Sequence, residues 1–172
     1  MNFLLTSGLG THSSEELVAF DAALLNAGIA DHNLVKISSI LPPHATEGIV
    51  VTSPKGSPLL TAYATISSSV PGTILATAVA VGLPKNPDDI GIIMELSTSV
   101  RKLYDSNSTD AAVIECRTGL ENRIKRMVED AMKNHRIEMA DLKLSSIATK
   151  IPFHITDDSK RAVSLVSALC LW

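Results

Sequence analysis

Apolar residues along the chain either alternate with polar ones or run together in short segments, a pattern typical of β-strands. Most segments end at turn-forming residues such as Pro42-Pro43 and Pro71-Gly72, and proline interrupts a strand ladder because it has no amide hydrogen. Residues 7–11 and 53–58 are predicted to be turns. The pattern predicts strands over residues 2–6, 33–38, 47–52, 59–67, 73–83, 90–100, 142–151 and 162–172.

Two segments have helical signals instead. Ser13 stands three residues before Glu16, which is the spacing of a capping box, and Gly28 suits the position just after a helix. These residues predict a helix over 14–27, and a second helix is predicted over 120–135, where apolar residues recur on one face. The short connections favour a single α+β domain spanning residues 1–172 over a parallel doubly wound sheet.

The stretch 101–119 is polar and irregular apart from AAVIE. It is predicted to be an insertion or a lid, and it could equally form part of a subunit contact.

Composition narrows the class of protein. Of the 172 residues, 45% are hydrophobic and only 3% are aromatic, so the core must consist mainly of Val, Ile, Leu and Ala. The net charge is −3 and the isoelectric point is near 5.9. Because the basic residues form no stripe interleaved with aromatic ones, the sequence argues against a nucleic-acid partner.

Metal and membrane signals are weak. Cys116 and Cys170 have no paired spacing, and the five histidines lack the spacing of metal ligands. The longest apolar run, residues 74–83, is shorter than the ~20 residues that cross a bilayer. These observations predict a cytoplasmic protein without a metal or a membrane partner.

Two carboxylates stand among apolar neighbours. Asp21 lies within the apolar stripe of the first predicted helix, between Leu17 and Leu25. It could form a structural ion pair, lie at an exposed edge of the stripe, or receive a cationic ligand. Glu95 follows the apolar run IGIIM in a strand whose two faces are both expected to be buried. Desolvation would favour its protonated form, which suits a general acid, although a glutamate emerging into solvent at a strand end fits equally well.

The segment KISSILPP places Ser38 and Ser39 between a strand and a proline pair. A serine hydroxyl can attack the preceding carbonyl if the backbone there is strained. The resulting ester can undergo β-elimination, which releases a carboxylate on Ser38 and leaves dehydroalanine at residue 39. Hydrolysis of that residue produces a pyruvoyl group and ammonia.

The segment AFDAALLNAGIADHNLVKISSILPP, together with TAYATI, VPG and GIIME, resembles the pyruvoyl-dependent arginine decarboxylases. The resemblance covers most of the chain. It implies a four-layer α/β/β/α sandwich that cleaves itself into a small chain 1–38 and a large chain 39–172. Between residues 98 and 117 the chain is longer and more polar than the family pattern, so no contacts are transferred there.

The resemblance also implies roles for individual residues. Ser39 is the source of a covalent pyruvoyl cofactor, and Ser38 and Asn33 take part in processing. Asp21, with Leu24 near it, binds the substrate L-arginine, and Glu95 protonates the decarboxylated intermediate. The implied reaction forms a Schiff base and yields agmatine and CO₂, a step toward polyamines.

The separation of Asn33 and Ser39 along the chain predicts an oligomer. Asn33 and Ser39 are six residues apart, which is about 20 Å along a straight strand. One chain cannot easily bring them together, so active sites shared between protomers are expected, as in the trimers that the resemblance implies. The alternatives are a pyruvoyl decarboxylase for another amino acid such as lysine or histidine, an unprocessed structural or regulatory homologue, and an unrelated sheet protein with a chance serine pair.

Overall fold

The computed structural model describes residues 1–101, 109–152 and 162–172, and these residues form two sheets and two helices. The first sheet has the strand order β2-β5-β9-β1-β4 and the second has the order β3-β7-β6-β8. The strands of the first sheet are β1 (Asn2–His12), β2 (Asn33–Lys36), β4 (Thr46–Glu47), β5 (Pro58–Ser68) and β9 (Ala162–Leu171). Those of the second are β3 (Ile40–Leu41), β6 (Thr73–Pro84), β7 (Gly91–Arg101) and β8 (Met139–Lys150).

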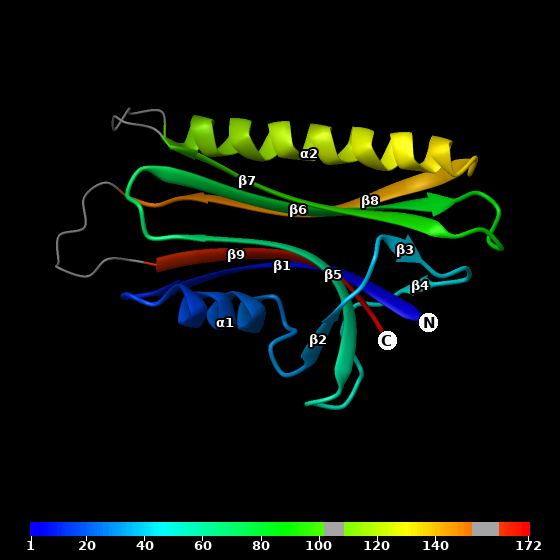
Figure 1. The fold of residues 1–172 in the computed structure, drawn as a ribbon, viewed down its shortest axis with the longest axis horizontal. Helices are drawn as coiled ribbons and strands as arrows, with labels where there is room; N and C mark the ends of the chain where they lie inside the picture. Colours follow the sequence, from blue (N-terminus) through cyan, green and yellow to red (C-terminus); the bar gives the residue numbers. More distant parts are fainter. Residues whose placement is uncertain (102–108, 153–161) are drawn as a thin grey trace.

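The two sheets pack face to face, and one helix lies on the outer side of each (Figure 1). The core between the sheets combines Phe3 and Leu169 of the first sheet with Val79 and Ile93 of the second. Helix α1 (Glu16–Asn26) packs on β1 and β9, whereas α2 (Thr109–Asn134) covers β6, β7 and β8. The α+β class is therefore confirmed.

The long apolar strands lie where the pattern predicts them. The almost entirely buried strands β6 and β9 correspond to the predicted segments 73–83 and 162–172. Strand β9 lies between β5 and β1 and is antiparallel to both, so the end of the chain is paired within the sheet.

The predicted turn at residues 7–11 is wrong, because β1 runs unbroken from Asn2 to His12. Its glycines are required by packing against α1. A Cβ atom added to Gly8 would overlap the carbonyl oxygen of Ala23, and one added to Gly10 would overlap that of Ala19. Glycine here permits a close approach between helix and strand rather than a change of chain direction.

Helix α1 ends as predicted at its C-terminus, but its N-terminus is not capped as predicted. No side chain caps the first turn at Glu15, so the expected capping box is wrong. The amides of Ser14 and Glu15 instead donate to Nδ1 of His12. At the other end Gly28 has φ +75° and donates to the Leu25 carbonyl. Ile29 donates to Leu24 in turn, which completes a Schellman motif.

Two other segments differ from their predictions. The predicted strand 47–52 is wrong beyond β4, since residues 48–52 are irregular and the side chain of Ile49 is 96% exposed. Helix α2 begins at Thr109 rather than at residue 120. The expected insertion at 101–119 is therefore helical from residue 109 onward, and residues 102–108 lie outside the described part of the chain.

Within the described ranges, neither helix is both long and apolar enough to cross a membrane. No group of three or more potential metal ligands occurs among the described residues. Both cysteines are free thiols, and burial raises the pKa of Cys170 to about 12.

Candidate active site at the crossing between the two sheets

The Ser38–Ser39 peptide lies where the chain passes from one sheet to the other. On the N-terminal side, β2 pairs with β5, and the Ile37 amide still donates to the Thr61 carbonyl of that sheet. On the C-terminal side, the Ser39 carbonyl accepts a hydrogen bond of 2.8 Å from Ile93 of β7, in the second sheet. The predicted break after a strand is confirmed, but the change of sheet is a feature that local patterning did not predict.

The backbone around Ser39 makes a tight turn. The Ile40 amide donates to the Ser38 carbonyl over 2.7 Å, which closes a three-residue γ-turn centred on Ser39. Ser38 is exposed and Ser39 is partly buried. The carbonyl that a processing reaction would attack is therefore already hydrogen-bonded in the folded chain.

Glu95 projects toward the same region. Alternate side chains of a strand share a face, so Glu95 lies on the side of β7 that carries Ile93 and faces the first sheet. It is about 7 Å farther along the strand than Ile93, whose amide binds the Ser39 carbonyl. The Ser39 carbonyl is thus bound to β7 two residues before Glu95, within one chain.

A cleft of about 440 Å³ opens beside Glu95, and Ser39 is not among the residues that line it. Glu95 and Lys36 line it from opposite sheets, with their side chains 3.7 Å apart between Oε1 and Nζ. Lys36 also lies over the ring of Tyr63, with Nζ 5.2 Å from the ring centroid. The remaining lining residues are Ala64, Thr65, Leu96 and Ser97.

The prediction that both faces of the Glu95 strand are buried is wrong for this part of β7. Residues 91–93 are buried, but the strand becomes partly exposed from Met94 onward. The side chain of Glu95 is 21% exposed because it stands at the mouth of the cleft rather than inside the core.

Asp21 is exposed on α1, as one of its predicted alternatives required. Leu17 and Leu25, one helical turn to either side, are 78% and 59% exposed. Leu24 is partly buried and packs on the core beneath the helix. Neither Asp21 nor Leu24 lines the cleft at Glu95, so one chain does not bring the two groups of predicted residues together.

Asn33 stands at the opposite end of β2 from Ser39. Its Nδ2 donates to the Gly56 carbonyl over 2.7 Å, and its amide donates to Ser57. The loop around Gly56 therefore holds Asn33 away from Ser39 in this chain, in agreement with the predicted separation.

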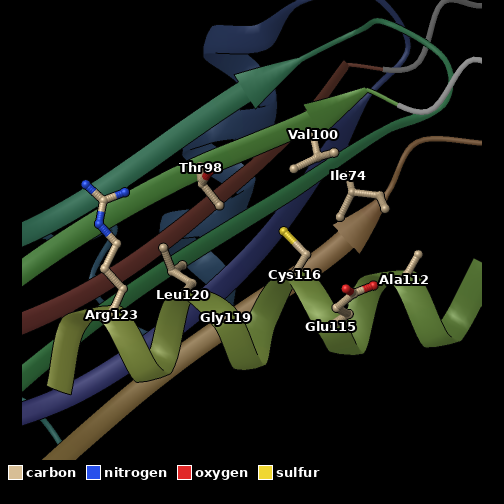
Figure 2. Close-up of a pocket in the computed structure, with 9 residues that line it drawn as sticks. All are labelled: Ile74, Thr98, Val100, Ala112, Glu115, Cys116, Gly119, Leu120 and Arg123. Carbon is tan, nitrogen blue, oxygen red and sulfur yellow. The ribbon is translucent and has the colours of Figure 1, made fainter. Parts of the chain in front are cut away.

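A larger cavity, of about 550 Å³, lies between α2 and the strands β6 and β7 (Figure 2). It contains none of the predicted site residues. Size alone therefore does not identify the reactive centre. The lining residues are Ile74, Thr98, Val100, Ala112, Glu115, Cys116, Gly119, Leu120 and Arg123.

Sequence reasoning missed Lys36 and Tyr63. Lys36 belongs to the segment that carries the serine pair, and its position two residues before Ser38 places it on the same side of an extended chain. That spacing was a usable signal for Lys36. Tyr63 comes from β5, and only the parallel pairing of β2 with β5 brings it near.

Comparison with known proteins identifies the family to which the chain is similar. The family profile described as "Pyruvoyl-dependent arginine decarboxylase (PvlArgDC)" matches residues 2–172. Three relatives named "Pyruvoyl-dependent arginine decarboxylase" illustrate the similarity. The Methanocaldococcus jannaschii protein is 48% identical over 79 residues, or 46% of this chain and 48% of that protein. The Methanococcus aeolicus protein is 41% identical over 120 residues, or 69% of this chain and 70% of that protein.

The third relative, from Thermococcus kodakarensis, is 34% identical over 132 residues, which cover 76% of this chain and 74% of that protein. The alignment with the M. jannaschii protein spans about half of that relative's length. The family profile, in contrast, extends from β1 to the last residue. The predicted resemblance is confirmed, and this chain belongs to the pyruvoyl-dependent arginine decarboxylase family.

Proposed function

We propose that this chain cleaves itself and decarboxylates L-arginine to agmatine and CO₂, a step toward polyamines. The observation that carries the proposal is the hydrogen bond from Ile93 to the Ser39 carbonyl, which ties Ser39 to β7 two residues before Glu95 on the same face of that strand. The helix, two sheets and second helix support the four-layer α/β/β/α sandwich that the resemblance implies.

The position of Ser38–Ser39 between two sheets favours processing. Cleavage there would produce a small chain 1–38 and a large chain 39–172. The new ends need not separate from the fold, because β2 is paired with β5 and β3 with β7. A cut at this bond removes the connection between sheet edges without removing a strand from either sheet.

A pyruvoyl group suits the residues at this site. Ser39 supplies its atoms, and Ser39 is only partly buried, so a small substrate can approach it. When formed, this covalent cofactor would supply a ketone that can condense with the substrate α-amine, with loss of water, and that would withdraw electrons as CO₂ leaves, the role that PLP plays in other decarboxylases.

The chain's own side chains bind the substrate and move the proton. Glu95 delivers a proton to the carbon that loses CO₂. Asp21 accepts paired hydrogen bonds from the planar guanidinium, an arrangement that suits arginine better than lysine. Leu24 contacts the aliphatic part of the substrate from the same helix.

These roles require a second protomer. Asp21 is exposed between the exposed Leu17 and Leu25, an arrangement that suits a contact with another copy. Asn33 is likewise far from the Ser39 of its own chain. We infer a trimer in which Asp21 or Asn33 of one protomer completes the site that contains Ser39 of the next.

Mixing two inactive chains tests the shared site. Coexpressed Asn33→Ala and Ser39→Ala chains should restore some processing, because an intact Asn33 from one chain can reach an intact Ser39 of the other. Neither variant should recover when expressed alone. Absence of any recovery in mixed oligomers would remove the support for shared sites.

Denaturing mass spectrometry tests the proposed function itself. The 18.3 kDa chain should give fragments of about 4 and 14 kDa, the larger beginning with a ketone instead of an amine. Borohydride reduction of that ketone should abolish arginine decarboxylation. A chain that remains whole on incubation would instead support an unprocessed regulatory homologue. Assays with lysine and histidine test the remaining enzymatic alternative.

A further inference from the structure

The peptide before Ser39 is held by a hydrogen bond within its own turn. The Ile40 amide lies 2.7 Å from the carbonyl oxygen of Ser38, and the Ser39 carbonyl is fixed separately by Ile93. The carbonyls of Ser38 and Ser39 therefore each accept a hydrogen bond from a main-chain N–H. The first of them is the one that the Ser39 hydroxyl would attack.

The Ile40 amide is available for this bond because it has no role in the strand ladder. Ile40 faces Ile92 in the antiparallel pair of β3 with β7. The neighbouring Ser39 carbonyl accepts from Ile93, so Ser39 and Ile93 form the hydrogen-bonded kind of pair. Ile40 and Ile92 then form the non-bonded kind, in which the amide points away from the partner strand. Strand β3 is at the edge of its sheet, so this amide is free to turn toward Ser38.

We propose that the main-chain N–H of Ile40 stabilises the oxyanion that forms on Ser38 during self-processing. This inference rests on the proposed function and adds a reacting group to it. The Ser39 Oγ forms a bond to the Ser38 carbonyl carbon, and the π electron pair moves to the oxygen beside the Ile40 N–H. The Ser38–Ser39 C–N bond then breaks, and the hydroxyl proton ends on the released nitrogen. The product is an ester isomer, so this step needs no other reactant.

The Ile40 N–H becomes an effective donor because negative charge develops on the Ser38 oxygen during the reaction. A hydrogen bond to a neutral carbonyl becomes charge-assisted when that oxygen turns anionic, and such bonds are about twice as strong. The Ile40 N–H therefore stabilises the transition state more than the resting peptide, which is the requirement for acceleration. The turn places the donor before the reaction begins.

Ile40→Pro removes the N–H and should cost no ladder bond, since this amide points away from β7. Ile40→Ala is the matched control, because it trims the side chain but keeps the donor. We expect processing, followed by mass spectrometry of fresh precursor, to slow by about 10²–10³-fold in Ile40→Pro. Ile40→Ala should stay within about threefold of the unmodified chain.

Proline also fixes φ and restricts the residue before it, so a second variant separates geometry from the donor. Replacing residue 40 by its α-hydroxy analogue, through nonsense suppression, exchanges the N–H for an ester oxygen without fixing φ. It should slow processing to a similar extent. Thermal unfolding of Ile40→Pro and the ester in a Ser39→Ala background establishes that each precursor folds.

The outcomes are distinguishable. If the ester variant processes as fast as Ile40→Ala, the donor role of Ile40 is wrong while the proposed function stands. If the unmodified chain never cleaves, the proposed function fails and the donor role fails with it.

Discussion

The ammonium of Lys36 lies 3.7 Å from the Glu95 carboxylate and joins the two sheets across the mouth of the cleft. Lys36 extends from β2, in the first sheet, and Glu95 extends from β7, in the second. The stacking of Lys36 over Tyr63 gives the ammonium a second contact. Lys36 precedes Ser38 by two residues, so one member of this pair stands on the segment that leads to the proposed cleavage site.

Lys36→Met should lower the turnover of arginine more than it lowers stability. The two side chains are 59% and 21% exposed, so loss of the pair should change the unfolding free energy by less than about 1 kcal/mol. The methionine side chain cannot hold Glu95 in the cleft, so kcat should fall with little change in KM. Lys36→Arg, which keeps a cation there, should recover much of kcat. An unchanged kcat in Lys36→Met would show that the pair has no role in turnover.

Asp21→Asn should abolish the preference for arginine while sparing self-processing. The amide keeps the shape of the side chain but loses the charge that attracts a guanidinium. Steady-state kinetics with arginine should show a rise in KM, and mass spectrometry should show normal cleavage. Glu16→Gln is the matched control, because it removes a charge from the exposed N-terminal turn of the same helix. Equal effects of the two variants would indicate a general charge effect rather than a specific contact.

Thiol labelling should distinguish the two cysteines. Burial raises the pKa of Cys170 to about 12, so its reactive thiolate is scarce at pH 8 and would become common only near or above pH 12. The partly exposed Cys116 also has a raised pKa, from desolvation and the nearby Glu115. Iodoacetamide at pH 8 should therefore modify Cys116 slowly and Cys170 only after denaturation. Rapid labelling of Cys170 in the folded protein would contradict its burial.

Gly10→Ala should move α1 away from β1, since the new methyl group would overlap the backbone of Ala19. We expect a loss of at least about 2 kcal/mol in the free energy of unfolding. Gly119→Ala provides the opposite case, because apart from the adjoining backbone of α2 no heavy atom lies within 4 Å of the added Cβ. It should stabilise the helix by about 0.5–1 kcal/mol. Chemical denaturation of both variants measures the contrast, and equal effects would show that close packing does not determine the response at Gly10.

Local patterning predicted the parts of the fold in which the chain's own periodicity decides the outcome. Strands β6 and β9 are long apolar segments, so burial and pairing agree with β propensity. The same reasoning failed at Gly8 and Gly10, where glycine usually indicates a turn. Their role depends on the packing of α1, which comes later in the chain, and local sequence patterns do not predict that contact.

The candidate site likewise has features that local sequence predicts and features that depend on long-range contacts. The serine pair and the proline pair that follows are adjacent in sequence, so the break in the strand could be predicted from local chemistry. The approach of Glu95 requires β3 to pair with β7, a long-range contact. Asp21 and Asn33 remain apart from Ser39 within one chain, and their proposed meeting depends on a neighbouring protomer.

Buried hydroxyls also connect the two sheets, and they provide a test of how strongly the sheets are coupled. Oγ of Ser167, in the first sheet, lies 2.9 Å from Oγ1 of Thr77, in the second, and both residues are fully buried. Oγ of Ser167 also lies 2.9 Å from Oγ of Ser7, in the first sheet. Ser167→Ala should destabilise the fold by about 1–3 kcal/mol, because it leaves a buried hydroxyl of Thr77 without this partner.

The double variant Ser167→Ala/Thr77→Val should lose less stability than the sum of the single variants, since it removes both ends of the bond. Urea unfolding in a Ser39→Ala background keeps the chain whole during the measurement. Ser99→Ala, at an exposed position of β7, is the control and should change stability by less than about 0.5 kcal/mol. Strictly additive losses would mean that the Ser167 and Thr77 hydroxyls stabilise the two sheets independently.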